Sequence, residues 1–290
     1  MSILFNTQCL QCHFNKNLQT ARELGTDGQA MEFARGMMEI YLRHPNAESA
    51  LEYGPEVTEL LCRLYGLEED RFREEKEISN AFVLERMEEL RRRCMGAADP
   101  VYAGLQFSIL GNYIDFSALY GEVSFEKLDE MLDKALEMDL DRGVYAQLLS
   151  DLERGGKLLY LTDNAGEIGF DRIFAEAIHE RFPQLQITFC VRGGPPLNDA
   201  TREDAAAVGI PFPVIDNGNT IAGTMLNALG EEARQALETA DVIIAKGQAN
   251  AETLLDSGYN IYFAFLVKCI RFQERFEKPK LTPMLVKERK

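Results

Sequence analysis

The pattern of hydrophobic and polar positions changes near residue 150. Before it, segments such as 29–43 and 80–93 carry apolar residues three and four positions apart amid dense charge, which predicts amphipathic helices. After it, short apolar runs alternate with helical segments, and these runs read LLYLTD, ITFCVRG, FPVID, VIIAKG and IYFAFLVKC. Such alternation is typical of parallel strands joined by crossover helices. We therefore predict an α/β protein, with an all-helical domain over 1–150 and a mainly parallel sheet domain over 151–290.

Two further segments refine this prediction. Segment 124–140 is predicted to be a helix whose N-cap residue is Ser124. The stretch after residue 275 is predicted to add an edge strand to the sheet.

Composition and charge exclude several classes of protein. The chain has 290 residues, of which 46% are hydrophobic, so it is long enough for a sizeable core. Its formal charge of −16 argues against a general nucleic-acid binder, because phosphate backbones are held mainly by clustered Lys and Arg. The sequence shows neither an export signal nor a long apolar segment, so we expect a cytoplasmic protein without a membrane partner.

Polar side chains follow three of the predicted strands at the point where each strand ends. Asp163 and Asn164 follow the first run, and Asn198 and Asp199 follow the second. Lys246 ends the VIIAKG run. Because ligands of open α/β sheets bind outside the carboxyl ends of parallel strands, we expect these groups to converge on one site.

The residue types at these strand ends suit a divalent metal and a phosphate. Asp163 and Asp199 offer carboxylate oxygens and Asn164 offers an amide oxygen, a set that suits Mg²⁺ or Mn²⁺. Lys246 offers a compact positive charge for an anion. A metal and a lysine on opposite sides of a phosphoryl group would stabilise the transition state of phosphoryl transfer.

Each motif alone also fits a structural role. Asp163-Asn164-x-Gly166 is a common turn sequence, and Asn198-Asp199 before an alanine-rich helix is a good N-cap. It is the placement of these motifs together that favours a functional site. Asp171, on the helix after the first turn, is expected to be a solvated or helix-packing residue.

The cysteines suggest reduced thiols. Cys9-x-x-Cys12-His13 has the form of a c-type haem attachment site, but haem attachment requires export. We expect these thiols to be free or structural first, and metal-binding or redox-active second. Cys190 and Cys269 lie in apolar runs and are expected to be small core side chains.

The motifs together resemble those of a known family. The segments TDNAGEIGFDR, RGGPPLNDATREDA, DNGNTIAGT and AKGQANAETL, with CLQC near the amino terminus, are similar to the short prokaryotic branch of the DUF89 family of metal-dependent damage-control phosphatases. This resemblance implies a helical domain packed on a Rossmann-like α/β domain, with a divalent ion (Mn, Mg, Co or Ni) between them. It also implies a phosphatase that acts on sugar phosphates or damaged phosphometabolites.

The resemblance assigns roles to individual residues. It places Asp163, Asn164 and Asp199 at the family's metal-binding positions. The further positions that it matches, assigned to substrate contact, are Glu167, Asn198, Lys246, Asn250, Asn112 and Asp115. In the expected mechanism Lys246 binds the phosphoryl group. Either a metal-activated water or Asp163 attacks the phosphorus, with water preferred.

Two other functional classes remain open. An S-adenosylmethionine-dependent carboxyl methyltransferase could use the same kind of sheet, but here the first run leads into DNAGE and not into a glycine-rich GxGxG loop. A non-catalytic metal-binding or metabolite-binding protein would keep the same site without turnover. The sequence leaves the oligomeric state unknown.

Overall fold

The order of helices and strands follows the change of pattern seen in the sequence. The structure is a computed structural model that describes residues 5–115 and 124–287. Within these residues the elements are α1 (Thr7–Leu24), α2 (Asp27–Arg43), η1 (Ala50–Tyr53), α3 (Gly54–Tyr65), α4 (Arg73–Met95), α5 (Pro100–Gly111), α6 (Phe125–Asp133), η2 (Ala135–Glu137), α7 (Arg142–Arg154), β1 (Lys157–Leu161), α8 (Glu167–Arg181), β2 (Gln186–Val191), α9 (Arg202–Ala207), β3 (Val214–Asp216), η3 (Leu226–Ala228), α10 (Glu231–Thr239), β4 (Val242–Lys246), α11 (Gly247–Leu254), β5 (Ile261–Leu266), α12 (Ile270–Phe276) and β6 (Pro283–Lys287).

The strands of the described residues form a six-stranded sheet in the order β3-β2-β1-β4-β5-β6. Strands β1 to β5 are parallel, and β6 pairs with β5 in the antiparallel direction. The five predicted strands and the predicted edge strand are therefore confirmed. The chain runs outward from β1 to β3 and then returns to β4, so the strand order reverses between β1 and β4. This is the position at which open α/β sheets bind their ligands.

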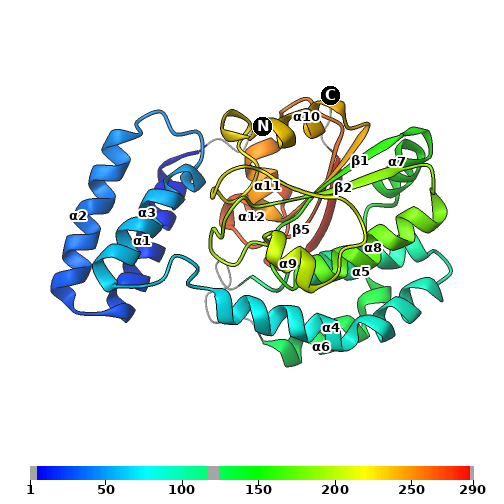
Figure 1. Cartoon of the computed structure of the whole chain (residues 1–290), viewed down its shortest axis with the longest axis horizontal. Coiled ribbons are helices and arrows are strands. Elements are labelled where there is room, and N and C mark those ends of the chain that lie inside the picture. Colours follow the sequence, from blue (N-terminus) through cyan, green and yellow to red (C-terminus); the bar gives the residue numbers. More distant parts are fainter. Residues whose placement is uncertain (1–4, 116–123, 288–290) are drawn as a thin grey trace.

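Helices cover both faces of the sheet (Figure 1). In β5, Tyr262 and Ala264 belong to the hydrophobic cluster shared with α4, α5 and α8. The alternate residues Phe263 and Phe265 belong to the cluster that includes residues of α10, α11 and α12. Because both faces are buried, the strands read as continuous apolar runs.

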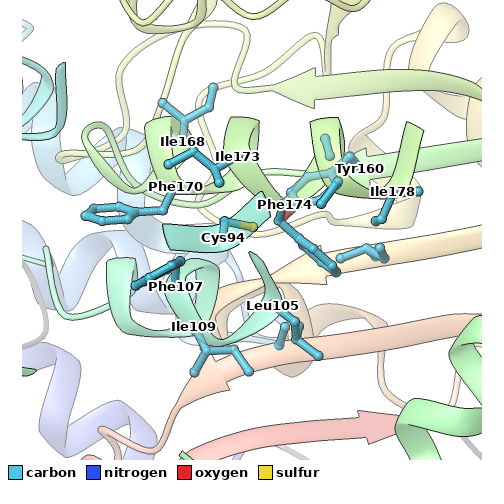
Figure 2. Close-up of a cluster of buried hydrophobic side chains, with 14 of the residues drawn as sticks. Cys94, Leu105, Phe107, Ile109, Tyr160, Ile168, Phe170, Ile173, Phe174 and Ile178 are labelled. Atoms are coloured by element: carbon cyan, nitrogen blue, oxygen red, sulfur yellow. The ribbon is translucent and has the colours of Figure 1, made fainter. Parts of the chain in front are cut away.

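Close packing of α5 against α8 positions the helical side of the site. A side chain at Gly104 would place its Cβ 2.9 Å from Cα of Phe174, so this glycine is needed for the close approach of the two helices. Figure 2 shows Phe107 of α5 and Phe170 of α8 in the cluster that fills the space between the helices. The C-cap residue of α5 is Asn112, which this packing carries to the carboxyl edge of the sheet.

The hydrophobic clusters divide the chain at a different place from residue 150. Helices α1 to α3 share their own cluster, which includes Phe33, Met37, Val57 and Leu61. Helices α4 to α7 instead contribute to the cluster that contains sheet residues. Figure 1 shows α1 to α3 as a bundle set beside the body that contains the sheet. The segment predicted as one helical domain therefore packs as two parts.

The predicted helices are present with adjusted ends. Segments 29–43 and 80–93 lie within α2 and α4. The hydroxyl of Ser124 accepts a hydrogen bond from the amide of Lys127, which confirms the predicted N-cap. The helix that follows ends at Asp133, earlier than predicted, because the chain turns into η2.

The cysteines differ from the expectation at one position. All six are free thiols, and Cys190 is buried as expected. Cys269 is only partly buried and is the N-cap residue of α12.

Burial lowers the pKa of His13 to about 4, and its Nδ1 lies 2.7 Å from the hydroxyl of Tyr41.

Among the helices of the described residues, none is long and apolar enough to cross a membrane.

Candidate active site

The structure brings the predicted strand-end residues together where the strand order reverses. Asp163 and Asn164 follow β1, and Lys246 ends β4, the neighbouring strand. The loop after β2 reaches the same place, because Asn164 and Asp199 form an antiparallel bridge. The amide of Ala200 also donates to the carbonyl of Asp163 at 2.7 Å. The backbone of one loop therefore fixes the position of the other.

Asparagine side chains surround the Asp163 carboxylate. Its Oδ2 accepts from Nδ2 of Asn112 at 3.0 Å and from Nδ2 of Asn164 at 2.9 Å. Nδ2 of Asn198 donates to Oδ1 of Asn164 at 2.9 Å. Oδ1 of Asn198 is buried and has no hydrogen-bond partner among the described residues. A buried amide oxygen without a donor is costly, and a bound cation would satisfy it.

Glu167 orients these amides from the first turn of α8. Its side chain is fully buried. Its carboxylate accepts from Nδ2 of Asn164 at 2.7 Å and from Nδ2 of Asn112 at 2.9 Å. Because each amide nitrogen points at Glu167, the amide oxygens of both residues must point elsewhere. Glu167 therefore acts on the site through its neighbours.

Lys246 has no donor left for a substrate. Its Nζ donates to the carbonyl of Ser108 at 2.8 Å and to Oε1 of Glu167 at 2.7 Å, and lies 3.0 Å from Oδ1 of Asp171. These contacts use all three protons of the ammonium group. Burial alone would lower the pKa of Lys246, but Asp171 and Glu167 outweigh it and raise the pKa. The geometry favours a bracing role over the predicted phosphate contact.

Asp171 is not a solvated residue. It is fully buried, and its Oδ1 accepts from Oγ of Ser108 at 2.7 Å and from the hydroxyl of Tyr160 at 2.8 Å. Burial raises the pKa of Asp171 to about 6, and the charge of Lys246 limits this rise. Of the two expected roles, the solvated one is wrong and the helix-packing one is confirmed, because α8 packs against α4 and α5 and Asp171 is bonded to Ser108 of α5.

Asn250 joins loop ends, and its side-chain amide is engaged by other protein groups. Its Nδ2 donates to the carbonyls of Thr162 at 3.0 Å and Lys246 at 2.7 Å. Its Oδ1 accepts from the hydroxyl of Thr224 at 2.7 Å. With these three bonds it ties α11 to the ends of β1 and β4 and to the segment after β3.

Arg192 supplies a buried positive charge behind the two aspartates. It is 1% exposed, and its Nε donates to Oδ2 of Asp199 at 2.8 Å. Burial raises the pKa of Asp199 to about 6, and Arg192 opposes this rise. Burial, followed by the charges of Glu167 and Asp199, raises the pKa of Asp163 well above its usual range. The site therefore holds more buried carboxylate charge than its arginine balances.

The donor set fits a hard divalent cation. The described residues contain no group of three His, Cys, Asp or Glu side chains that could hold a metal, so amide oxygens must complete the set. Two carboxylates with the amide oxygens of Asn164 and Asn198 are the ligands that Mg²⁺ and Mn²⁺ prefer. Gly247 keeps space here: its φ is +76°, and a Cβ would lie 1.9 Å from Oδ2 of Asp163.

Comparison with known proteins identifies the family. The damage-control phosphatase ARMT1-like domain matches residues 5–280 of this chain. The chain belongs to the DUF89 family of damage-control phosphatases. A DUF89 family protein of Pyrococcus horikoshii, solved at 2.04 Å resolution, shares the fold with a TM-score of 0.82 at 29% identity. That alignment covers 99% of this chain and 100% of the other.

Several relatives are similar to this DUF89 chain in sequence. A protein of Methanocaldococcus jannaschii is 33% identical over 92% of this chain and 90% of its own length. A damage-control phosphatase of Archaeoglobus fulgidus is 34% identical over 69% of this chain and 70% of its own length. A damage-control phosphatase of Pyrococcus horikoshii is 36% identical over 61% of each chain. The predicted family and fold class are thereby confirmed.

The DUF89 motifs did not point to Lys268, which the structure places beside the site. Its Nζ donates to Oδ2 of Asp115 at 2.6 Å, and its side chain is 4% exposed. Its charge opposes the rise in the pKa of Asp163. Burial lowers the pKa of Lys16, which lies on α1. The charge of Asp115 opposes this shift and the charge of Lys268 adds to it, so α1 lies beside the pair of Lys268 and Asp115. Lys268 lies shortly after β5, so the strand-end reasoning applied to the other strands would have found it.

Proposed function

We propose that this protein is a metal-dependent phosphatase that hydrolyses small phosphate esters in the crevice between β1 and β4. The observation that carries the proposal is the pair of buried carboxylates where the strand order reverses, Asp163 held by asparagine amides and Asp199 held by Arg192. Family membership and the names of two relatives support phosphatase activity. Sugar phosphates and damaged phosphometabolites are the proposed substrate class.

In this proposal the metal is held by Asp163, Asn164 and Asp199, with the partnerless amide oxygen of Asn198 as an added donor. Mn²⁺, Mg²⁺, Co²⁺ and Ni²⁺ are the candidate ions. The bound ion would polarise the phosphoryl group and neutralise its charge. Water and the substrate would fill the remaining positions of the ion.

We assign the phosphate contact to Lys268 and a positioning role to Lys246. The ammonium of Lys246 is fully engaged by protein acceptors. Within the described residues Nζ of Lys268 donates to one side chain, that of Asp115, and the charge of Lys268 acts on Asp163. An ammonium held by one carboxylate keeps protons for a phosphate oxygen. The wall of the crevice opposite the sheet is then formed by Asn112 and Asp115, after α5.

A water molecule is the proposed nucleophile. Oδ2 of Asp163 already accepts two hydrogen bonds, from Asn112 and Asn164, which lower its nucleophilicity. Its other oxygen is the one assigned to the metal. Acid quench during the first turnover, followed by mass analysis, should find Asp163 unmodified. A phosphoryl group on the carboxylate of Asp163 would instead show a covalent intermediate.

The activity is tested by assaying a generic phosphate ester with chelated protein and after addition of each metal. Metal-dependent release of phosphate supports the proposal. Binding of metal and phosphate without turnover would favour a non-catalytic binding protein. Methyl transfer from S-adenosylmethionine with no phosphate release would favour the methyltransferase alternative.

A further inference from the structure

We infer that Arg192 is a positioning residue that makes the crevice select small six-coordinate cations over Ca²⁺. The inference rests on the metal site proposed above. It concerns which carboxylate oxygens of Asp163 and Asp199 are available to bind an ion. The guanidinium is 1% exposed and its hydrogen bonds go to Asp199 and Thr162, so we assign it a role through these neighbours.

Arg192 connects the loop after β2 to the loop after β1. Its Nε holds Oδ2 of Asp199 at 2.8 Å. Its Nη2 donates to the carbonyl of Thr162 at 3.2 Å and lies 4.0 Å from Oδ1 of Asp163. The planar guanidinium is anchored to the loop after β1 and holds the Asp199 carboxylate in the loop after β2. Rotation of the Asp199 carboxylate would break this hydrogen bond inside the protein.

The second aspartate is restrained in the same way. Oδ2 of Asp163 is occupied by Asn112 and Asn164. Among residues 5–115 and 124–287, no hydrogen bond reaches Oδ1 of Asp163 or Oδ1 of Asp199. Each carboxylate therefore offers one oxygen to an ion.

One oxygen per carboxylate favours a small ion. Ca²⁺ takes six to eight oxygens and often binds both oxygens of a carboxylate, whereas Mg²⁺ takes six in a strict octahedral arrangement. Partners behind the ligands commonly set metal affinity in this way. Arg192, by holding Oδ2 of Asp199, removes the second oxygen that Ca²⁺ would use.

The test measures ion binding without turnover. Mn²⁺ binding to chelator-treated protein is followed by the electron paramagnetic resonance signal of the free ion, and Mg²⁺ and Ca²⁺ are titrated as competitors. The wild type should bind Mg²⁺ about tenfold or more tightly than Ca²⁺. In Arg192→Gln the ratio should shift towards Ca²⁺ by about tenfold. The control is Arg86→Gln, which breaks the pair between Arg86 of α4 and Asp129 of α6 and should leave the ratio unchanged.

Arg192→Lys keeps the positive charge without the planar fork, so it serves if the glutamine variant does not fold. It should show a smaller shift of the same sign. An unchanged ratio in the folded variant, or a wild type that binds Ca²⁺ as tightly as Mg²⁺, would overturn the inference. A wild type that binds none of the three ions would refute the proposed metal site itself.

Discussion

Lys246 and Glu167 form an ion pair of 2.7 Å in which neither side chain is exposed to solvent. Replacing Lys246 by Met would leave Glu167 and Asp171 as uncompensated buried carboxylates. Breaking a buried pair in this way costs about 3–5 kcal/mol of the free energy of unfolding. Urea denaturation of Lys246→Met should show this loss, and adding Glu167→Gln should recover part of it.

A second paired lysine provides the control. Lys287 is paired with Asp151 at 2.7 Å and lies opposite Tyr262 at the start of β5, the end of that strand away from the crevice. Lys287→Met should lower stability but leave Mn²⁺ affinity unchanged, whereas Lys246→Met should lower both. A Lys246→Met variant of full stability that loses only phosphate affinity would restore the phosphate-binding role predicted from the sequence.

Lys268 is expected to bind the phosphoryl group. Lys268→Ala should raise the Michaelis constant for a phosphate ester and lower kcat/KM by about 10- to 100-fold, because the ammonium contacts the substrate in the ground and transition states. The inhibition constant of inorganic phosphate should rise in parallel. Lys278→Ala, which removes an exposed lysine, is the matched control. An unchanged phosphate inhibition constant in Lys268→Ala would contradict the assignment.

Gly247 should tolerate no side chain. Its Cβ would overlap the Asp163 carboxylate, so Gly247→Ala should displace that side chain and abolish Mn²⁺ binding. Gly258 also has a positive φ, of +85°, but a Cβ at this position would have no described atom within 4 Å. Gly258→Ala therefore carries similar backbone strain without the overlap. Equal Mn²⁺ affinity in both variants would show that Asp163 does not bind the ion.

Metal binding should compete with protons. The pKa of Asp199 is raised to about 6 and that of Asp163 is also raised, so an ion must displace protons below about pH 6. Mn²⁺ affinity should fall about tenfold per pH unit for each proton displaced. Isothermal titration in buffers of different ionisation enthalpy measures this proton release. Affinity that is constant from about pH 5 to about pH 8 would contradict the raised pKa values.

The raised pKa of Asp199 also predicts how the stability of the metal-free protein changes with pH. The pKa of Asp199 is 3.8 when the chain is unfolded and about 6 when it is folded. The folded state therefore holds more protons between these values, and this group makes stability fall as pH rises through the interval. Saturating Mn²⁺ should oppose that fall.

The sequence predicted the sheet and the strand-end residues because both depend on local pattern. Apolar runs that end in polar residues placed Asp163, Asn164 and Asp199 at one edge of a parallel sheet, and the structure brings them together. Lys268 lies in the last of these runs, IYFAFLVKC, so the same local pattern extends to it.

The sequence could not predict the state of Lys246. Lys246 donates to the carbonyl of Ser108, which lies 138 residues away along the chain. Its partner Asp171 lies on a helix whose sequence pattern does not indicate a buried charge. Whether an ammonium is free or fully bonded depends on such tertiary contacts. The orientation of Arg192 behind Asp199 likewise follows from the joining of two loops.

The most direct test of the proposed active site compares the wild type with Asp163→Asn. This change keeps the size of the side chain and removes one charge, and it should not destabilise the fold because the pKa of Asp163 is already raised. We predict that chelated wild-type protein regains phosphate release when Mn²⁺ is added. The variant should remain folded, bind Mn²⁺ about 100-fold more weakly and release no phosphate. Wild-type levels of Mn²⁺-dependent phosphate release by Asp163→Asn would contradict the account.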